Sequence, residues 1–169
     1  NGGTPPFTFA WFNGVNPVGT GAALANLPAG TYTIQLTDAN GCTISAQTTI
    51  TQPDTLVAGG AFVNPTCSGF SNGSIDLTVA GGTIPYIYQW SSGATTQDLA
   101  GIPAGSYDVT VTDANGCQAT AQFGLTEPNP LTASLTGQNI SCFGLADGSL
   151  TLAVQGGTVP YAFQWADGP

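Results

Sequence analysis

A long internal repeat is the feature of this chain that most restricts its fold. Three different segments recur at one and the same spacing: GGTIPYIYQW (81–90) with GGTVPYAFQW (156–165), LPAGTYTIQLTDANGC (27–42) with IPAGSYDVTVTDANGC (102–117), and CSGFSNGSIDLTVAGG (67–82) with CFGLADGSLTLAVQGG (142–157). The period of about 75 residues exceeds that of helical solenoids, roughly 33–47 residues, and suits a small domain that folds by itself. We therefore expect tandem copies of one module.

An earlier copy of the first segment, GGTPPFTFAW at 2–11, begins four residues before the place that this period predicts. The four additional residues fall between Trp11 and Leu24, where the next copy has only SSGATTQD. We expect this insertion to alter one loop and to leave the rest of the module unchanged.

Within the repeat, apolar residues alternate with polar ones. Over residues 74–79, for example, Ile75, Leu77 and Val79 fall on one face, and polar residues separate them. Alternation over four to eight residues, bounded by Gly, Pro and Asn, predicts half-buried antiparallel strands. The sequence Asp-Ala-Asn-Gly, which occurs twice, predicts a tight hairpin turn. No helical periodicity of useful length is present, so the predicted class is all-β.

The one complete copy predicts about seven strands, six of which can be delimited: 56–65, 74–80, 86–91, 96–99, 106–112 and 118–126. Turns spaced roughly 8–12 residues apart favour an immunoglobulin-like β-sandwich. In that fold Trp90 would face the core from strand C. Tyr107 would form a tyrosine corner, with its hydroxyl bonded to the backbone.

The repeat phase predicts three modules: a partial one at 1–53 (strands C to G), a complete one at 54–129 and a partial one at 130–169 (strands A to C). Half a sandwich leaves its inner face wet and its strand edges unpaired. Either the natural polypeptide continues in both directions, or the two ends complete each other between molecules. We favour continuation, because residues 1–11 and 155–165 cover the same place in the repeat.

Composition excludes several functions. The chain has nine acidic residues and a net charge of −9, and it contains no Lys, Arg, His or Met. Without cations it cannot neutralise nucleic-acid phosphates, and without His or Lys it lacks protease triads, Walker loops and most His-containing metal sites. No apolar run reaches about 18 residues, so we expect no membrane insertion. We expect no enzyme activity and no cofactor.

The carboxylates recur at fixed places in the repeat, most clearly as Asp38 and Asp113 in the two Asp-Ala-Asn-Gly turns. We interpret them as turn residues whose side chains bind backbone N–H groups. An alternative is a calcium ligand, since hard cations prefer oxygen. A glycosidase pair would need two acids converging in one cleft, and acids spread along a repeat argue against it.

The aromatic residues also recur, always on one face of a strand. We expect them to form the core, because a domain of about 75 residues needs such side chains to fold. An exposed sugar-stacking platform is the alternative. The predicted core aromatic residues are Trp11, Trp90, Trp165, Tyr32 and Tyr107.

Four cysteines, Cys42, Cys67, Cys117 and Cys142, occupy two positions of the repeat, each of them twice. Their use in a small helix-free domain favours disulfides in an oxidising compartment. A Cys67–Cys117 bridge would join opposite ends of a sandwich, which strains it. We favour Cys42–Cys67 with Cys117–Cys142, each pair spanning a Pro-centred connection. Bridges between neighbouring modules and free thiols stay open.

Two segments resemble a known repeat. GGTPPFTFAW with LPAGTYTIQLTDANGC, and then GGTIPYIYQWSSGATTQDLAGIPAGSYDVTVTDANGC, are similar to the SprB-type repeat of gliding-motility and cell-surface adhesins of Bacteroidota. The resemblance covers essentially the whole chain. It implies tandem β-sandwich modules on very long surface or secreted proteins that are exported by the type IX system and act in adhesion, gliding or biofilm formation. No catalytic residue belongs to that repeat.

Three residues are candidates for glycosylation. Asn72 and Asn139 stand in N-x-S/T sequons. Thr55 lies in Asp54-Thr55-Leu56, which matches the O-glycosylation signal that the resemblance implies.

We therefore expect a non-catalytic, adhesive repeat segment of an extracellular or cell-surface protein. Its expected partners are neighbouring modules of the same chain, copies that self-assemble or pack laterally in a fibre, and glycans. The alternative function is a carbohydrate- or calcium-binding surface module that uses loops such as residues 12–23.

Overall fold

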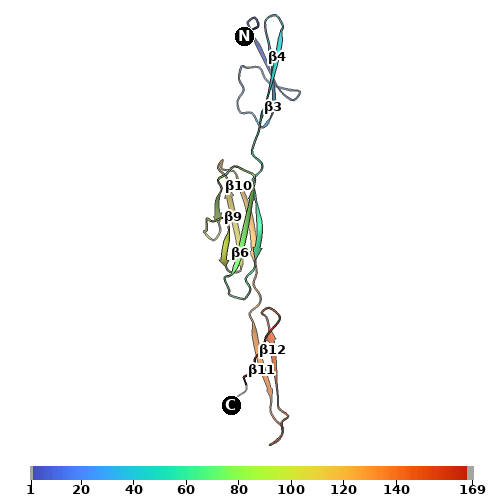
Figure 1. Cartoon of the computed structure of the whole chain (residues 1–169), viewed down its shortest axis with the longest axis vertical. Coiled ribbons are helices and arrows are strands. Elements are labelled where there is room, and N and C mark those ends of the chain that lie inside the picture. Colours follow the sequence, from blue (N-terminus) through green and yellow to red (C-terminus); the bar gives the residue numbers. More distant parts are fainter. Residues whose placement is uncertain (1, 167–169) are drawn as a thin grey trace. The chain divides into compact units, whose positions relative to one another are not determined.

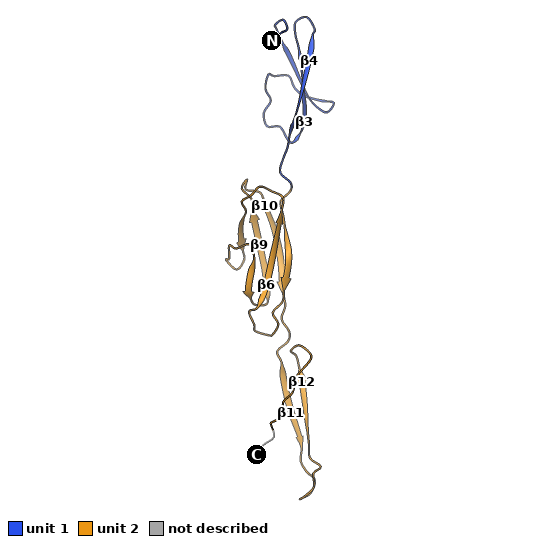
Figure 2. Ribbon diagram, viewed as in Figure 1, with its two compact units in different colours: residues 1–54 blue, residues 55–169 orange. Residues whose placement is uncertain are grey.

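The computed structural model describes residues 2–166, and every regular element in that range is a β-strand. The chain divides into two compact units, Asn1–Asp54 and Thr55–Pro169 (Figure 2). Each unit is described by itself below. The predicted all-β class is confirmed.

The first part of the second unit is a sandwich of two three-stranded antiparallel sheets, which we call the central module (Figure 1). Its strands are β5 (Val57–Val63), β6 (Gly73–Ala80), β7 (Ile87–Trp90), β8 (Leu99–Ile102), β9 (Gly105–Thr112) and β10 (Gln118–Leu125). The sheet orders β5-β6-β8 and β10-β9-β7 correspond to strands A-B-E and G-F-C of an immunoglobulin-like fold without strand D. The predicted fold class is confirmed. All six strands that the sequence delimits are found, with the short one displaced from 96–99 to Leu99–Ile102, and the seventh, which the sequence did not delimit, is not formed within residues 55–129.

The core of the central module lies between its two sheets. On β6, Ile75 and Leu77 are buried while Asp76 and Thr78 are exposed, as the alternation predicts. Facing them on the other sheet are side chains from β7, β9 and β10. The buried apolar set is Ile75, Leu77, Trp90, Leu99, Tyr107, Val109, Val111, Phe123 and Leu125. Burying each large side chain contributes about 1.5–3 kcal/mol, so this set is what makes the module stable.

Two core aromatic residues also anchor loops through their polar atoms. The Tyr107 hydroxyl donates a hydrogen bond to the carbonyl of Pro103 at 2.9 Å, the backbone bond expected of a tyrosine corner. The Trp90 indole N–H donates to the carbonyl of Thr96 at 2.8 Å. Both rings are therefore buried without leaving a polar atom unpaired.

The variant Tyr107→Phe should lower the free energy of unfolding of the central module by about 1 kcal/mol, since it removes one hydrogen bond and keeps the ring. The control is Tyr88→Phe, whose hydroxyl bonds at the surface to Gln97. That variant should change stability by less than about 0.5 kcal/mol. Urea unfolding curves measure both, and equal effects would contradict the role assigned to Tyr107.

The first unit contains a single four-stranded sheet of order β2-β1-β3-β4. Its strands are β1 (Thr8–Asn13), β2 (Asn16–Gly19), β3 (Gly30–Thr37) and β4 (Thr43–Ile50). Strands β3 and β4 lie one repeat period before β9 and β10, and β1 is the repeat counterpart of β7. The four-residue insertion forms part of the β1–β2 hairpin. This sheet is therefore the counterpart of β10-β9-β7.

The aromatic anchors recur in the first unit. The Tyr32 hydroxyl donates to the carbonyl of Pro28 at 2.9 Å, and Tyr32 is buried. The indole N–H of Trp11, which is half-buried, donates to the carbonyl of Gly21 at 2.8 Å. The repeat thus reproduces contacts as well as sequence.

The last described part of the chain holds β11 (Thr132–Gln138) and β12 (Ser149–Gln155), which pair as an antiparallel hairpin. These strands are the repeat counterparts of β5 and β6. Residues 161–166 form no strand, although β7 lies at the equivalent place. Trp165 is 58% exposed and is not a core residue as predicted, because no second sheet covers it among residues 130–166. The division at 1–53, 54–129 and 130–169 stays a prediction.

Candidate functional site

The most elaborate polar site of the central module surrounds Asp113, at the start of the β9–β10 hairpin. Its Oδ2 accepts a hydrogen bond from the N–H of Thr83 at 2.9 Å. Its Oδ1 accepts from the N–H groups of Asn115 at 2.9 Å and Cys117 at 2.8 Å. The side chain is buried, with 4% of its surface exposed. Asp113 therefore ties the hairpin to the loop that precedes β7.

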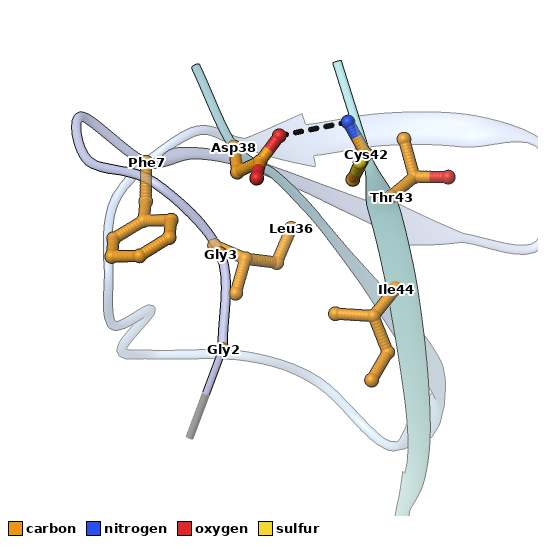
Figure 3. Close-up of a pocket in the computed structure, with 8 residues that line it drawn as sticks. All are labelled: Gly2, Gly3, Phe7, Leu36, Asp38, Cys42, Thr43 and Ile44. Carbon is orange, nitrogen blue, oxygen red and sulfur yellow. Dashed lines mark hydrogen bonds between the residues drawn. The ribbon is translucent and has the colours of Figure 1, made fainter. Parts of the chain in front are cut away.

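The first unit contains the same site around Asp38. Its carboxylate accepts hydrogen bonds from the N–H groups of Thr4 at 3.0 Å, Asn40 at 3.0 Å and Cys42 at 2.8 Å. Figure 3 shows the bond between Asp38 and Cys42. Every partner has the same repeat position as a partner of Asp113. We call each of these arrangements the aspartate clamp.

The clamps favour charged carboxylates. Burial is the largest influence on the pKa of Asp113 and raises it, but the N–H bonds from Cys117, Thr83 and Asn115 together lower that pKa below its ordinary 3.8. The pKa of Asp38 is also lowered, and the largest cause is the hydrogen bond that its carboxylate accepts from the backbone N–H of Thr4. The folded state therefore prefers the carboxylate, and acid should weaken both clamps.

The clamp geometry does not suit a calcium ion. Both carboxylate oxygens of Asp113 already face N–H donors, whose positive ends repel a cation. Within residues 2–166 no three His, Cys, Asp or Glu side chains gather as a metal site requires. Carboxylate oxygens that bind backbone in this way act as structural acceptors.

Metal removal should therefore leave the fold unchanged. We expect thermal unfolding of the chain in excess EDTA, and again after Ca²⁺ is added, to give Tm values within about 1 °C of each other, because a ligand that binds the folded state would raise Tm. If Ca²⁺ raised the Tm of the parent chain but not that of Asp38→Asn or Asp113→Asn, the alternative of calcium binding would be supported instead.

A pocket of about 260 Å³ lies beside the clamp of the first unit (Figure 3). Its wall includes the apolar side chains of Phe7, Leu36 and Ile44, and Asp38 is also one of its lining residues. The lining residues are Gly2, Gly3, Phe7, Leu36, Asp38, Cys42, Thr43 and Ile44. Such a lining suits an apolar group and not a charged substrate.

The cysteines are unpaired and exposed, so the prediction of disulfides is not supported, whether for Cys42–Cys67, Cys117–Cys142 or Cys67–Cys117. For the last pair the reason is geometric. The loop of Cys67 is bound near the end of β10, where the N–H of Gly69 donates to Glu127 at 2.8 Å, whereas Cys117 directly precedes its start. Eight residues of strand span roughly 25 Å, and a disulfide needs Cα atoms within about 7 Å.

The glycosylation candidates Thr55, Asn72 and Asn139 are all exposed and lie outside strands. Asn72 is the most constrained, because its Oδ1 accepts from the N–H of Thr66 at 3.1 Å and its Nδ2 donates to the Thr66 hydroxyl at 2.8 Å. Among residues 2–166, the side chains of Thr55 and Asn139 make no comparable bond. Modification at all three stays a prediction.

The hydrogen bonds between Thr66 and Asn72 close the loop between β5 and β6, and the sequence did not predict them. The same bond pattern recurs one repeat period later, where Asp147 accepts from the N–H of Ser141 at 3.0 Å and also from its hydroxyl. The hydroxyl bond is the main reason that the pKa of Asp147 is lowered. A Thr or Ser six residues before Asn or Asp in both copies was the available signal.

The strand order and the two clamps define a class of protein: a tandem β-sandwich repeat whose polar sites hold loops together. No helix in the described part of the chain has the length and hydropathy needed to cross a membrane.

The SprB repeat family model matches residues 59–95 and 134–169, two segments whose first residues are one repeat period apart. The resemblance found in the sequence is thereby confirmed at two places. No curated protein matches the chain.

Among solved structures, the chain is similar to the N-terminal four Ig domains of Dscam1 isoform 6.44. The identity is 16% and the TM-score 0.34, over 73% of this chain and 38% of that chain.

Proposed function

We propose that this chain is a non-catalytic structural segment of a long extracellular or cell-surface protein, in which repeated modules space and present the parts that adhere. The observation that carries the proposal is that the conspicuous side chains of the repeat make the same structural contacts in two copies. Tyr32 and Tyr107 fasten corresponding corners, and Asp38 and Asp113 fasten corresponding hairpins. Side chains that make these contacts hold the module together, which is the role that a structural segment requires.

The match to the SprB repeat supports a surface location, and the β-sandwich supports a mechanical role. The central module buries its own apolar core, and a chain of such modules would unfold one module at a time under tension, with a length that increases with repeat number. The Pro-containing connections, such as Gln52-Pro53-Asp54, restrict bending. A glycan on Thr55, beside that connection, would fit the same role.

The test is immunogold electron microscopy of intact cells of the source organism, with antibodies raised against this chain. Gold along surface threads with regularly spaced beads would support the proposal. The proposal would be contradicted if labelling required permeabilised cells. It would also be contradicted if the gold marked compact isolated particles. Binding of a defined glycan to the chain on an array and in a calorimeter would favour the alternative of a carbohydrate-binding module.

A further inference from the structure

The first and last strands of the central module, β5 and β10, lie close together where they end. Phe62, near the end of β5, meets Phe123, near the end of β10, edge to face with ring centroids 6.4 Å apart. Just beyond the two strands, the Oδ1 of Asn64 accepts a hydrogen bond from the N–H of Thr126 at 3.0 Å. The place where the chain leaves the module is therefore next to the end of its first strand.

The same two strands are also neighbours where they begin. Leu56 directly precedes β5, and Asp113 opens the hairpin that leads into β10. The two side chains meet over Gly82, where an added Cβ would lie 2.9 Å from Leu56 and 3.0 Å from Asp113. The two strands thus run in the same direction. The chain therefore enters the central module at one end and leaves it at the other (Figure 1).

Tension between those two ends pulls β5 and β10 along their own axes, in opposite directions. Each strand is then drawn against its antiparallel partner, β5 against β6 and β10 against β9. Hydrogen bonds between paired strands lie perpendicular to the strands. A force along the strands therefore strains all the bonds of a pair at once, whereas a force across them would open one bond after another. The module is loaded in the direction in which its outer strands resist separation best.

A group of side-chain bonds fastens the exit of the module to the end of β5. Glu127, the second residue after β10, accepts hydrogen bonds from the N–H of Gly69 at 2.8 Å and from the hydroxyl of Ser68 at 3.1 Å. Both donors lie in the loop that follows β5. One residue before Glu127, Thr126 donates to Asn64. We call these three bonds the exit clasp. Hydrogen bonds to a carboxylate are stronger than those between neutral groups.

We infer that the exit clasp carries the tension that passes through the central module. The force travels from Leu56 along the covalent backbone of β5 and through the clasp to Glu127. The core and the pairing of β10 with β9 are spared until the clasp opens. The inference deepens the proposed mechanical role and rests on it, since it names the residues that would perform that role.

The experiment stretches single molecules of the 169-residue chain at constant force in an optical trap, with a DNA handle at each terminus. Unfolding of the central module, residues 56–126, is recognised by the release of up to about 250 Å of chain. The variant with both Asn64→Ala and Glu127→Ala should shorten the lifetime of the folded module under force at least about tenfold, because it removes all three bonds of the clasp. Glu127→Gln, which keeps an acceptor oxygen, should have an intermediate lifetime.

Tyr107→Phe is the matched control, because it removes a hydrogen bond of the core that is not part of the clasp. It should weaken the module in urea, yet keep the lifetime under force within about twofold of the parent value. The reason is that a bond still formed when the clasp opens does not affect the rate of that step. A released length equal to that of the parent chain shows that each variant module was folded before it was stretched.

The inference would be overturned if the double variant lasted as long under force as the parent chain. It would also be overturned if Tyr107→Phe shortened the lifetime as much as the double variant does. Either result would leave the proposed function standing, since immunogold labelling tests where the protein resides and the optical trap tests only which bonds carry the force.

Discussion

Replacing Leu77 by alanine is expected to destabilise the central module by about 2–5 kcal/mol, the range for deleting a buried leucine side chain. Leu77 has no exposed surface and lies in the middle of β6, between the two sheets. The surrounding strands are held in register from both sides, so they can close the resulting cavity only in part. Hydrogen exchange of the β6 and β9 amides, followed by mass spectrometry, measures the loss.

Leu152→Ala is the matched control, because Leu152 has the same repeat position on β12 and is only half-buried. We expect exchange of the β6 and β9 amides to stay at the parent rate in this variant. If both variants accelerated exchange in the central module alike, the stability of that module would not reside in its own core. The pair therefore tests whether the repeat folds module by module.

The second large effect is expected from Asp113→Ala. The substitution leaves three backbone N–H groups, those of Thr83, Asn115 and Cys117, without their acceptor in a buried place. Losing even one such bond lowers Tm by about 4–8 °C in a domain of this size, and we expect at least that shift. Asp76→Ala, at an exposed position of β6, is the control and should leave Tm nearly unchanged.

The clamp also predicts a pH dependence. The pKa of Asp113 is lowered in the folded state, so its stabilising contribution is present above the ordinary value of 3.8 and is lost as the pH falls through the folded value. The difference in stability between the parent chain and Asp113→Asn should thus be full near neutrality and shrink below about pH 4. A difference that stays constant on acidification would contradict a clamp made by the ionised carboxylate.

The pattern of residues was sufficient to predict the strands and the class of fold. Alternation in Ser74–Val79 gave β6, and Asp-Ala-Asn-Gly gave both hairpins, because these signals depend on neighbours a few residues apart. The exact position of β8 and the absence of strand D from the central module were not predicted. Residues 91–98 carry no alternation, and only pairing with a strand far along the chain decides whether they become extended.

Contacts between distant segments were also beyond the sequence. Asp113 was interpreted as a local turn residue, and the structure adds the bond to Thr83, 30 residues earlier. The cysteines were expected to pair from their number and spacing. The structure leaves all four unpaired, and it separates Cys67 from Cys117 by the length of a strand, as their expected places at opposite ends of a sandwich had indicated.

The order of residues thus establishes which module this chain repeats, since alternation, turns and the long period are properties of the linear chain. The order of residues does not establish which apolar side chains are buried. Ile75 and Leu150 occupy one repeat position and carry similar side chains, yet one is 1% and the other 62% exposed. Tertiary structure alone made that distinction, because the sheet of β7, β9 and β10 packs against Ile75, whereas no second sheet lies across Leu150 among residues 130–166.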